Sequence, residues 1–351
     1  MKTSFVSSYA TQTSMRLIVK QAQAEIQQLQ TEVVTGRHAD IGVALGGQTS
    51  NAVRLHRDFE QFSTIQDTNS LVDNRLSSAQ AALEQSSTSA QDLLETLIIA
   101  KDATDDGLRN VAVLEISDSL RAFTDAGNLT ANGEHLFAGI NTDTKPLVDY
   151  FEPGNAAKTA FDTAFLTYFG FSQTNAATST ITAAQMTDFL DNTVEPMFTG
   201  TAWTTDWSSA SDTNITSRIA REELVQTSVN ANSDGFRNVA FAATISLEMM
   251  NIGLGEEAQS VLVDKAIDVA GRGVSAVDDD RTRLGISQAR LEKANNLLQV
   301  QADLTKIHVS EMEEVDIYEA STRVNALMAQ IETSYSITSR LQQLNLIDYL
   351  R

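Results

Sequence analysis

Two stretches of the sequence have residue types that could bind a metal ion. Residues Asp278–Asp280 are three consecutive carboxylates, and a second stretch begins like a calcium-binding loop with Asn230, Asn232 and Asp234. The twelfth position of that loop is Phe241, where calcium requires a bidentate carboxylate. Consecutive residues of a helix point in different directions, so we interpret the aspartate run as a solvated helix face. Neither stretch predicts a metal site.

Phosphate binding and nucleophilic catalysis have even less support. Segment 41–47 contains three glycines but lacks the Lys-Ser/Thr pair of a phosphate-binding loop, so we interpret it as a hinge. The chain has no cysteine and no G-x-S-x-G motif. None of its four histidines lies at metal-ligand spacing to another: His38, His56, His135 and His308. We therefore expect no cofactor and no enzymatic activity.

The composition argues against several classes of partner. The net charge is −21, from 25 Lys and Arg against 46 Asp and Glu. Nucleic acids and anionic membranes bind basic surfaces, so we expect neither as a partner. No stretch approaches the roughly 18 continuous apolar residues of a membrane-spanning helix. Residues 1–20 lack the apolar region of a classical signal peptide, so export would need another route.

The elements that organise the chain are heptad-patterned helices at its two ends. Residues 281–351 contain no proline and a single glycine, and apolar residues recur through them at three- and four-residue steps. We expect one long helix there. An earlier part of the same stretch follows these steps with Leu297, Val300, Leu304 and Ile307. A helix with such an apolar stripe cannot bury the stripe against itself, so it needs a partner.

That partner is predicted at the other end of the chain. Apolar residues from Met15 to Val33 follow steps of four and three, and Gly36 then ends the helix. Two such helices predict a chain that leaves and returns along one axis, although an ordinary bundle core explains the same pattern. A single helix of this kind is not stable alone and must gain burial from neighbouring subunits. The candidate assembly interface is Met15, Val19, Ala22, Ile26, Leu29, Val33, Val324, Leu327, Ile331, Leu341, Leu344 and Leu346.

The middle of the chain has a different character. Helical patterns cover residues 53–102, 108–126 and 215–251, and another begins near Glu256. Residues Leu136–Leu147 have the pattern of a short strand, a turn and a returning strand. All helix-breaking prolines lie in this middle part: Pro146, Pro153 and Pro196.

These patterns predict a mainly α fold. Long coiled-coil-like helices from both termini form a rod, with a β-hairpin and an inserted mixed α/β or β domain. We expect a terminal domain of coaxial helices from residues 1–40 with 310–351, and a helical rod domain from residues 41–150 with 215–309. Residues 151–214 are expected to form an inserted, variable outer domain.

Three stretches together resemble the hook–filament junction family of bacterial flagella (FlgL), within the flagellin-like superfamily. Residues Leu29–Arg37 (LQTEVVTGR) are similar to the family's LQ…L.TG(K/R). Residues Leu136–Pro146 (LFAGINTDTKP) are similar to its (L/F)(F/S)(A/S)G…TDT.P. Glu319-Ala320 and residues Ser339–Leu350 (SRLQQLNLIDYL) resemble the shared EA…RL..LSL.DYL terminus. The resemblance covers about residues 1–150 and 280–351.

The resemblance implies a structural role outside the cell. In such proteins the paired terminal helices form the inner core of a polymer, and the subunit is exported unfolded through the flagellar type III channel. The implied partners are further copies of the chain in a ring at the hook tip, the preceding hook-associated junction protein, flagellin and an export chaperone.

Three alternatives remain open at this point. A filament flagellin usually carries SSG.RINSA.DDAAG after its first helix, whereas residues 35–42 read TGRHADIG, which also departs from the commoner junction pattern. The heptads alone would suit a cytoplasmic coiled-coil adaptor. A carbohydrate-acting enzyme in residues 150–216 is supported only by scattered carboxylates.

Overall fold

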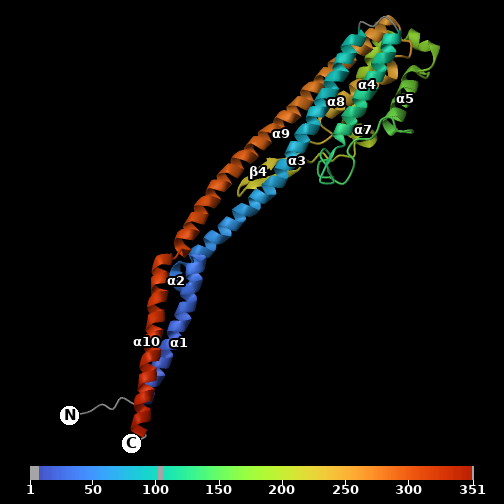
Figure 1. Ribbon diagram of the computed structural model, residues 1–351. Helices are drawn as coiled ribbons and strands as arrows, with labels where there is room; N and C mark the ends of the chain where they lie inside the picture. Colours follow the sequence, from blue (N-terminus) through green and yellow to red (C-terminus); the bar gives the residue numbers. More distant parts are fainter. Residues whose placement is uncertain (1–7, 102–105, 350–351) are drawn as a thin grey trace. The chain divides into compact units, whose positions relative to one another are not determined.

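The computed structural model describes residues 8–101 and 106–349 and divides the chain into two compact units. We call residues 1–64 with 299–351 the terminal unit, and residues 65–298 the central unit. Long helices dominate the described residues, together with two small antiparallel sheets, which confirms the mainly α fold (Figure 1). Two of the helices, α3 (Thr49–Lys101) and α9 (Glu256–Glu313), contribute residues to both units.

The terminal unit contains the first and last helices of the chain. Helix α1 (Ser8–Thr35) and helix α10 (Ile317–Tyr349) lie side by side (Figure 1). Gly36 follows α1 with a φ of 69°, a left-handed conformation that favours glycine, so the predicted helix stop is confirmed. The short helix α2 (Ile41–Leu45) and the 3₁₀ turn η1 (Gly46–Gln48) then lead into α3.

The prediction of one helix over residues 281–351 is wrong. Helix α9 ends at Glu313, and α10 begins at Ile317. The residues between them pair with the chain that follows α1: Val315 N donates to Gly36 O at 3.0 Å. Asp316 then caps α10, because its carboxylate accepts from the backbone N–H groups of Tyr318 and Glu319. This pairing joins residues far apart in sequence, so periodicity alone could not reveal it.

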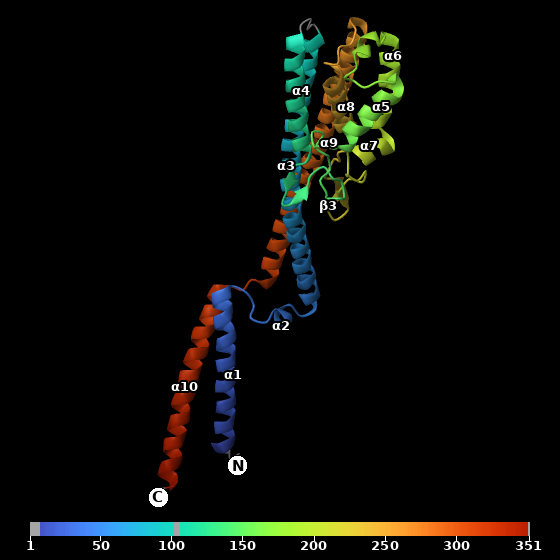
Figure 2. The same cartoon turned by 90° about the vertical axis from the view of Figure 1, so that its right-hand side faces the viewer.

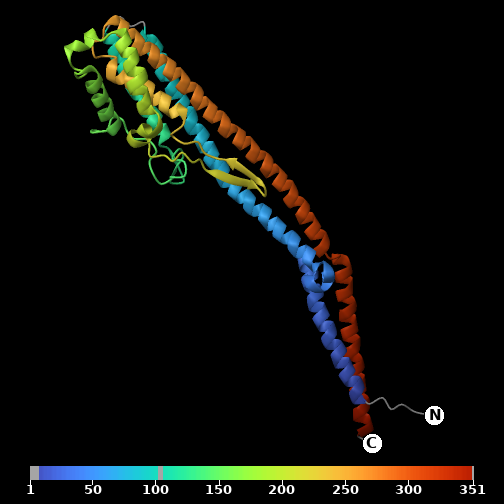
Figure 3. The ribbon, with the colours of Figure 1, turned by 180° about the vertical axis from the view of Figure 1, so that it is seen from behind.

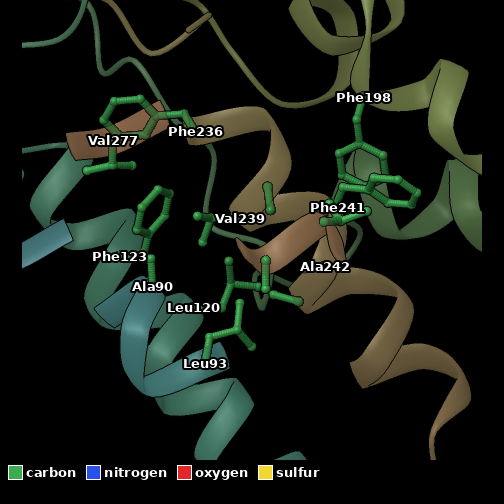
Figure 4. Close-up of a cluster of buried hydrophobic side chains, with 14 of the residues drawn as sticks. Ala90, Leu93, Leu120, Phe123, Phe198, Phe236, Val239, Phe241, Ala242 and Val277 are labelled. Atoms are coloured by element: carbon green, nitrogen blue, oxygen red, sulfur yellow. The ribbon is translucent and has the colours of Figure 1, made fainter. Parts of the chain in front are cut away.

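The core of the central unit is built around α8 (Asp234–Met249), which is buried on nearly all sides. Helix α4 (Asp106–Gly127) packs against it, with the Phe123 and Phe236 rings 5.2 Å apart (Figure 4). Two glycines allow α8 and α9 to approach closely. A Cβ added at Gly273 would lie 2.8 Å from Val239 Cγ2, and one at Gly235 would lie 2.9 Å from Val277 N.

This close approach predicts a large difference between two glycines of one helix. Gly273→Ala is expected to destabilise the protein by about 1–3 kcal/mol, because the new methyl group overlaps Val239. Gly271→Ala, with nothing within 4 Å of the added Cβ, should stabilise it by about 0.5–1 kcal/mol. Urea unfolding of both variants measures the difference. Equal effects would show that helices α8 and α9 do not pack as closely as described.

The first hairpin lies before the predicted one. Strands β1 (Thr130–Ala131) and β2 (Glu134–His135) pair across Asn132-Gly133, whose φ angles are 54° and 85°. An Asn-Gly pair is the strongest local signal for such a turn, so this hairpin could have been predicted from the sequence. Residues 136–147, predicted as strand, turn and strand, form only isolated bridges, from Ala138 to Asn230 and from Leu147 to Ser208.

The backbone around Gly139, in the 136–146 motif, leaves no room for a side chain. Gly139 has a φ of 63°, and a Cβ there would lie 2.5 Å from Ser211 O. The backbone on both sides is held, since Ala138 O accepts from Ser211 N and Ile140 N donates to Thr213 O.

A second hairpin replaces part of a predicted helix. Residues 215–251 were expected to be helical, but β3 (Thr216–Ala220) and β4 (Glu223–Gln226) occupy the first part and α8 begins only at Asp234. The β3–β4 hairpin lies beside α3 (Figure 3). Asn69 of α3, which is fully buried, holds this hairpin by donating to Ile219 O at 2.9 Å. Because contacts to α3 stabilise these strands, the hydrophobic pattern of residues 216–226 alone did not predict them.

Residues 151–214 are helical wherever they are regular. Figure 2 shows α5 (Ala156–Phe169), α6 (Ala183–Asp188) and α7 (Gly200–Asp206) beside α8. The 3₁₀ turns η2 (Ala176–Thr180) and η4 (Glu195–Phe198) and the π-helical turn η3 (Phe189–Val194) connect them. Their aromatic side chains join the α8 core, and the Phe198 and Phe241 rings stack at 5.0 Å. An inserted domain with the boundaries 151–214 remains a prediction.

Candidate assembly interface

Helices α1 and α10 form an antiparallel pair in one fixed register. Thr338 Oγ1 donates to Met15 Sδ at 3.5 Å, and Arg323 Nε donates to Glu25 Oε1 at 3.0 Å. The α10 residue in contact changes from 338 to 323 as the α1 residue changes from 15 to 25, so the two helices run in opposite directions. The expectation of paired terminal helices is therefore met within the described residues.

The predicted apolar positions of α1 lie on the side of the helix that packs against α10. Ala22 is 4% exposed, and the other predicted positions of α1, Met15, Val19, Ile26, Leu29 and Val33, are half-buried. On α10, Val324 and Leu327 are buried and Ile331 is half-buried. The side chains of Leu341, Leu344 and Leu346 lie outside the described residues. The structure thus places the described positions from Met15 to Val33 and from Val324 to Ile331 on two helices that pack together within one chain, and their role between subunits remains a prediction.

A second set of apolar side chains in the terminal unit is exposed to solvent in a single chain. Leu17 is 56% exposed and Tyr335 is also 56% exposed, although both lie on helices with a buried seam. The stripe predicted on α9 is likewise open, with Val300, Leu304 and Ile307 each more than half exposed. Among the described residues of α1 and α10, the exposed large apolar side chains are Leu17, Ile18, Val34, Ile317, Tyr318, Met328, Tyr335 and Ile337. Apolar surface of this kind marks an interaction site in a folded protein.

The two units differ sharply in charge. Residues 1–64 and 299–351 contain 10 Lys and Arg against 13 Asp and Glu, a net charge of −3. The remaining residues contain 15 against 33, a net charge of −18. Copies of the terminal unit can therefore pack together with little electrostatic repulsion, whereas copies of the central unit repel one another.

A buried carboxylate holds the joint between α9 and α10. The Glu313 side chain is 1% exposed; its Oε1 lies 2.6 Å from His56 Nε2, and its Oε2 lies 3.4 Å from Arg37 Nη1. Glu313 O also accepts from His38 N at 2.9 Å. The sequence pattern did not predict this cluster, because the helix expected over residues 281–351 runs through it without a break. Asp316 followed by Glu319 is a helix-start pattern that could have revealed the joint.

The stretches that could bind metal serve other purposes. Asn232 Nδ2 donates to Ala210 O and to Asp212 Oδ1, and Asn232 Oδ1 accepts from Trp203 Nε1. The loop that begins like a calcium site therefore ties residues 203–212 to the start of α8. Within residues 8–101 and 106–349, no group of three His, Cys, Asp or Glu side chains is placed to hold a metal ion. In the same ranges no helix has the length and hydrophobicity needed to cross a membrane.

The aspartate run is only partly a solvated face. Asp279 is exposed and Asp278 accepts from Ser87 Oγ at 2.9 Å, but Asp280 is buried at 3% exposure, so the prediction is wrong for Asp280. Asp280 follows Val277 by three residues and precedes Leu284 by four, and both of those are buried. It therefore occupies a heptad position on the inner face of α9, a signal that the run of like residues concealed.

Burial makes Asp280 a source of pH-dependent stability. Burial raises the pKa of the Asp280 carboxyl above its ordinary value, the Asp234 and Asp279 carboxylates add to this, and Arg283 opposes it. The folded protein therefore binds the proton of Asp280 more tightly than the unfolded chain does. The stability that this proton adds is fully present below the ordinary pKa of an aspartate, and it is lost as the pH rises through the raised pKa of Asp280 in the folded protein. Asp280→Asn should gain stability over wild type as pH rises from about 4 to 7.

The exposed neighbour provides the control for this prediction. Asp279→Asn removes the same charge from a solvated position and should show a much smaller pH-dependent difference. Urea unfolding at several pH values checks both variants. A pH profile of Asp280→Asn that runs parallel to that of wild type would contradict the raised pKa.

Comparison with known proteins identifies two matching family models. Residues 6–142 match the bacterial flagellin N-terminal helical region, and residues 267–350 match the bacterial flagellin C-terminal helical region. Together these matches cover more than half of the chain and include both terminal helices. No curated protein sequence matches the chain.

A solved structure shares the fold. It is described as a flagellar hook-associated protein from Vibrio parahaemolyticus, and it aligns with a TM-score of 0.53 over 76% of this chain and 97% of that one. The sequences are 11% identical, so the likeness concerns the fold alone.

Proposed function

Because the chain belongs to the flagellin-like superfamily, we propose that this structural protein of the flagellum joins the hook to the filament. The observation that carries self-assembly is the terminal unit, which combines uncovered apolar side chains with a net charge of only −3. In this role the α1–α10 pair packs against the same pair in neighbouring copies, and the strongly acidic central unit stays apart from its equivalents.

The junction role is favoured over a filament flagellin by two sequence segments. Residues 35–42 depart from the flagellin pattern after the first helix, although they also depart from the commoner junction pattern, and residues Leu136–Pro146 resemble the junction family. In this role the chain contacts the preceding hook-associated protein on one side and flagellin on the other, after export with the help of a chaperone. A filament flagellin shares the same terminal helices and is the second candidate.

A gene deletion separates the two candidates. If the chain forms the junction, electron microscopy of the deletion strain should show hooks without filaments, while flagellin accumulates in the culture medium. If the chain is itself the filament subunit, the hooks should also be bare, but the medium should lack the main filament protein. Normal filaments in the deletion strain would contradict both roles.

The outward apolar side chains give a more local prediction. Replacing Ile18 and Ile337 together with serine should leave the melting curve of the monomer nearly unchanged, because these side chains are 42% and 41% exposed. Filament formation should weaken strongly, since each isoleucine loses up to about 1 kcal/mol of burial at a subunit contact and every copy in the assembly repeats the loss. Motility and filament counts measure this. Gln330→Ser, an exposed polar change on α10, is the control and should behave as wild type.

A further inference from the structure

The central unit has an exposed apolar surface that the proposed assembly does not use. On α4, Leu108, Val111 and Leu114 follow one another at three-residue steps, and each is more than half exposed. At the adjoining end of α3, Ile98 and Ile99 are 52% and 66% exposed. Helices α3 and α4 also bury a separate face made of residues such as Leu97 and Ile116. These five exposed side chains, which we call the α3–α4 patch, are therefore additional to the core.

The patch continues into a groove between the two helices. The groove has a volume of about 460 Å³ and begins at Ile99. Farther along, four carboxylates line it: Asp92 and Glu95 on α3, and Glu115 and Asp118 on α4. Glu115 lies four residues after Val111 on α4, so the apolar and acidic parts belong to one continuous helix face.

The groove contains no compensating positive charge. No Lys or Arg lines it, and no ion pair joins its four carboxylates to a basic side chain within residues 8–101 and 106–349. The unit that carries the groove has a net charge of −18. A second central unit would add carboxylates to this surface, so the charge disfavours self-association here and favours a cationic partner.

We propose that the α3–α4 patch and groove bind a basic amphipathic segment of a different protein. Aliphatic side chains of that segment cover Ile99, Leu108 and Val111, and its Lys or Arg side chains face Asp92, Glu95, Glu115 and Asp118. A helix with apolar residues at three- and four-residue spacing fits this arrangement, because it places aliphatic and basic residues along one side. This partner is distinct from the copies of the chain that pack through the terminal unit.

Peptide binding to the full chain tests the proposal. The probe is a synthetic helical peptide of Leu and Lys with Leu along one face, and the matched peptide has Glu in place of Lys. We expect the Leu/Lys peptide alone to bind, and hydrogen exchange to slow within residues 92–99 and 108–118. Glu115→Lys and Val111→Ser should each weaken binding about tenfold. Glu222→Lys, in the exposed turn between β3 and β4, should change it less than about twofold.

Four outcomes would overturn the proposal. Equal weakening by Glu222→Lys would show that the peptide responds only to the overall negative charge. Failure of the Leu/Lys peptide to bind would exclude this class of partner. Displacement by magnesium chloride, beyond that by sodium chloride of equal ionic strength, would identify a cation site instead. Self-association of the wild-type chain that Leu114→Ser abolishes would identify a second copy as the occupant.

Discussion

Leu327→Asp is expected to abolish assembly and to unpair the terminal helices, while the central unit stays folded. Leu327 is 5% exposed in the seam between α1 and α10. An aspartate there buries a charge with no partner, which costs about 3–5 kcal/mol. The central unit has its own core, so its thermal transition should not move. Circular dichroism should show loss of helix without a shift of the main transition, and cells should lack filaments.

Asn325→Asp is the matched control for this change. It adds the same charge two residues earlier on α10, at an exposed position, so helix content and filament formation should match wild type. Normal filaments in the Leu327→Asp strain would show that the seam is dispensable and would contradict an assembly role for the α1–α10 pair.

Replacing residues 153–214 with a short Gly/Ser linker is expected to unfold the central unit. The sequence pattern predicts a separable insertion there, but the packing ties this segment to α8. Removing it uncovers Phe241, which stacks on Phe198, and Tyr150, which stacks on Trp207 at 5.2 Å. Losing even one large aromatic side chain from a core lowers the free energy of unfolding by about 3–5 kcal/mol, which is a large part of the stability of a typical domain.

Point substitutions test the same dependence without shortening the chain. Trp203 is fully buried and donates to Asn232, so Trp203→Ala should cost about 3–5 kcal/mol. Leu166 of α5 is 51% exposed, and Leu166→Ala should cost far less. Thermal unfolding measures each variant and the deletion. A cooperative transition in the deletion variant at the wild-type temperature would show that residues 151–214 form a separate domain.

The spacing of apolar residues predicted the terminal helices well, because the residues of each apolar seam recur in consecutive turns of one helix. The positions from Met15 to Val33 and from Val324 to Ile331 lie on the faces that the seven-residue spacing indicates. The helix stop at Gly36 is equally local, since it needs only a residue that tolerates a positive φ. These parts of the fold depend on short-range chemistry.

The missed features depend on contacts between distant residues. The break after Glu313 forms because residues 313–315 pair with residues 36–38, and β3–β4 is held by Asn69, 150 residues away from Ile219. The sequence could not show which side a single chain covers and which it leaves for a neighbour.

Gold labelling of isolated flagella with an antibody against the central unit tests the central claim most directly. If the chain assembles through its terminal unit at the hook–filament junction, the label should form one band between hook and filament in every flagellum. Label along the whole filament would identify a filament subunit instead. A protein found only in the cytosol, with no label on any flagellum, would contradict a role in the flagellum altogether.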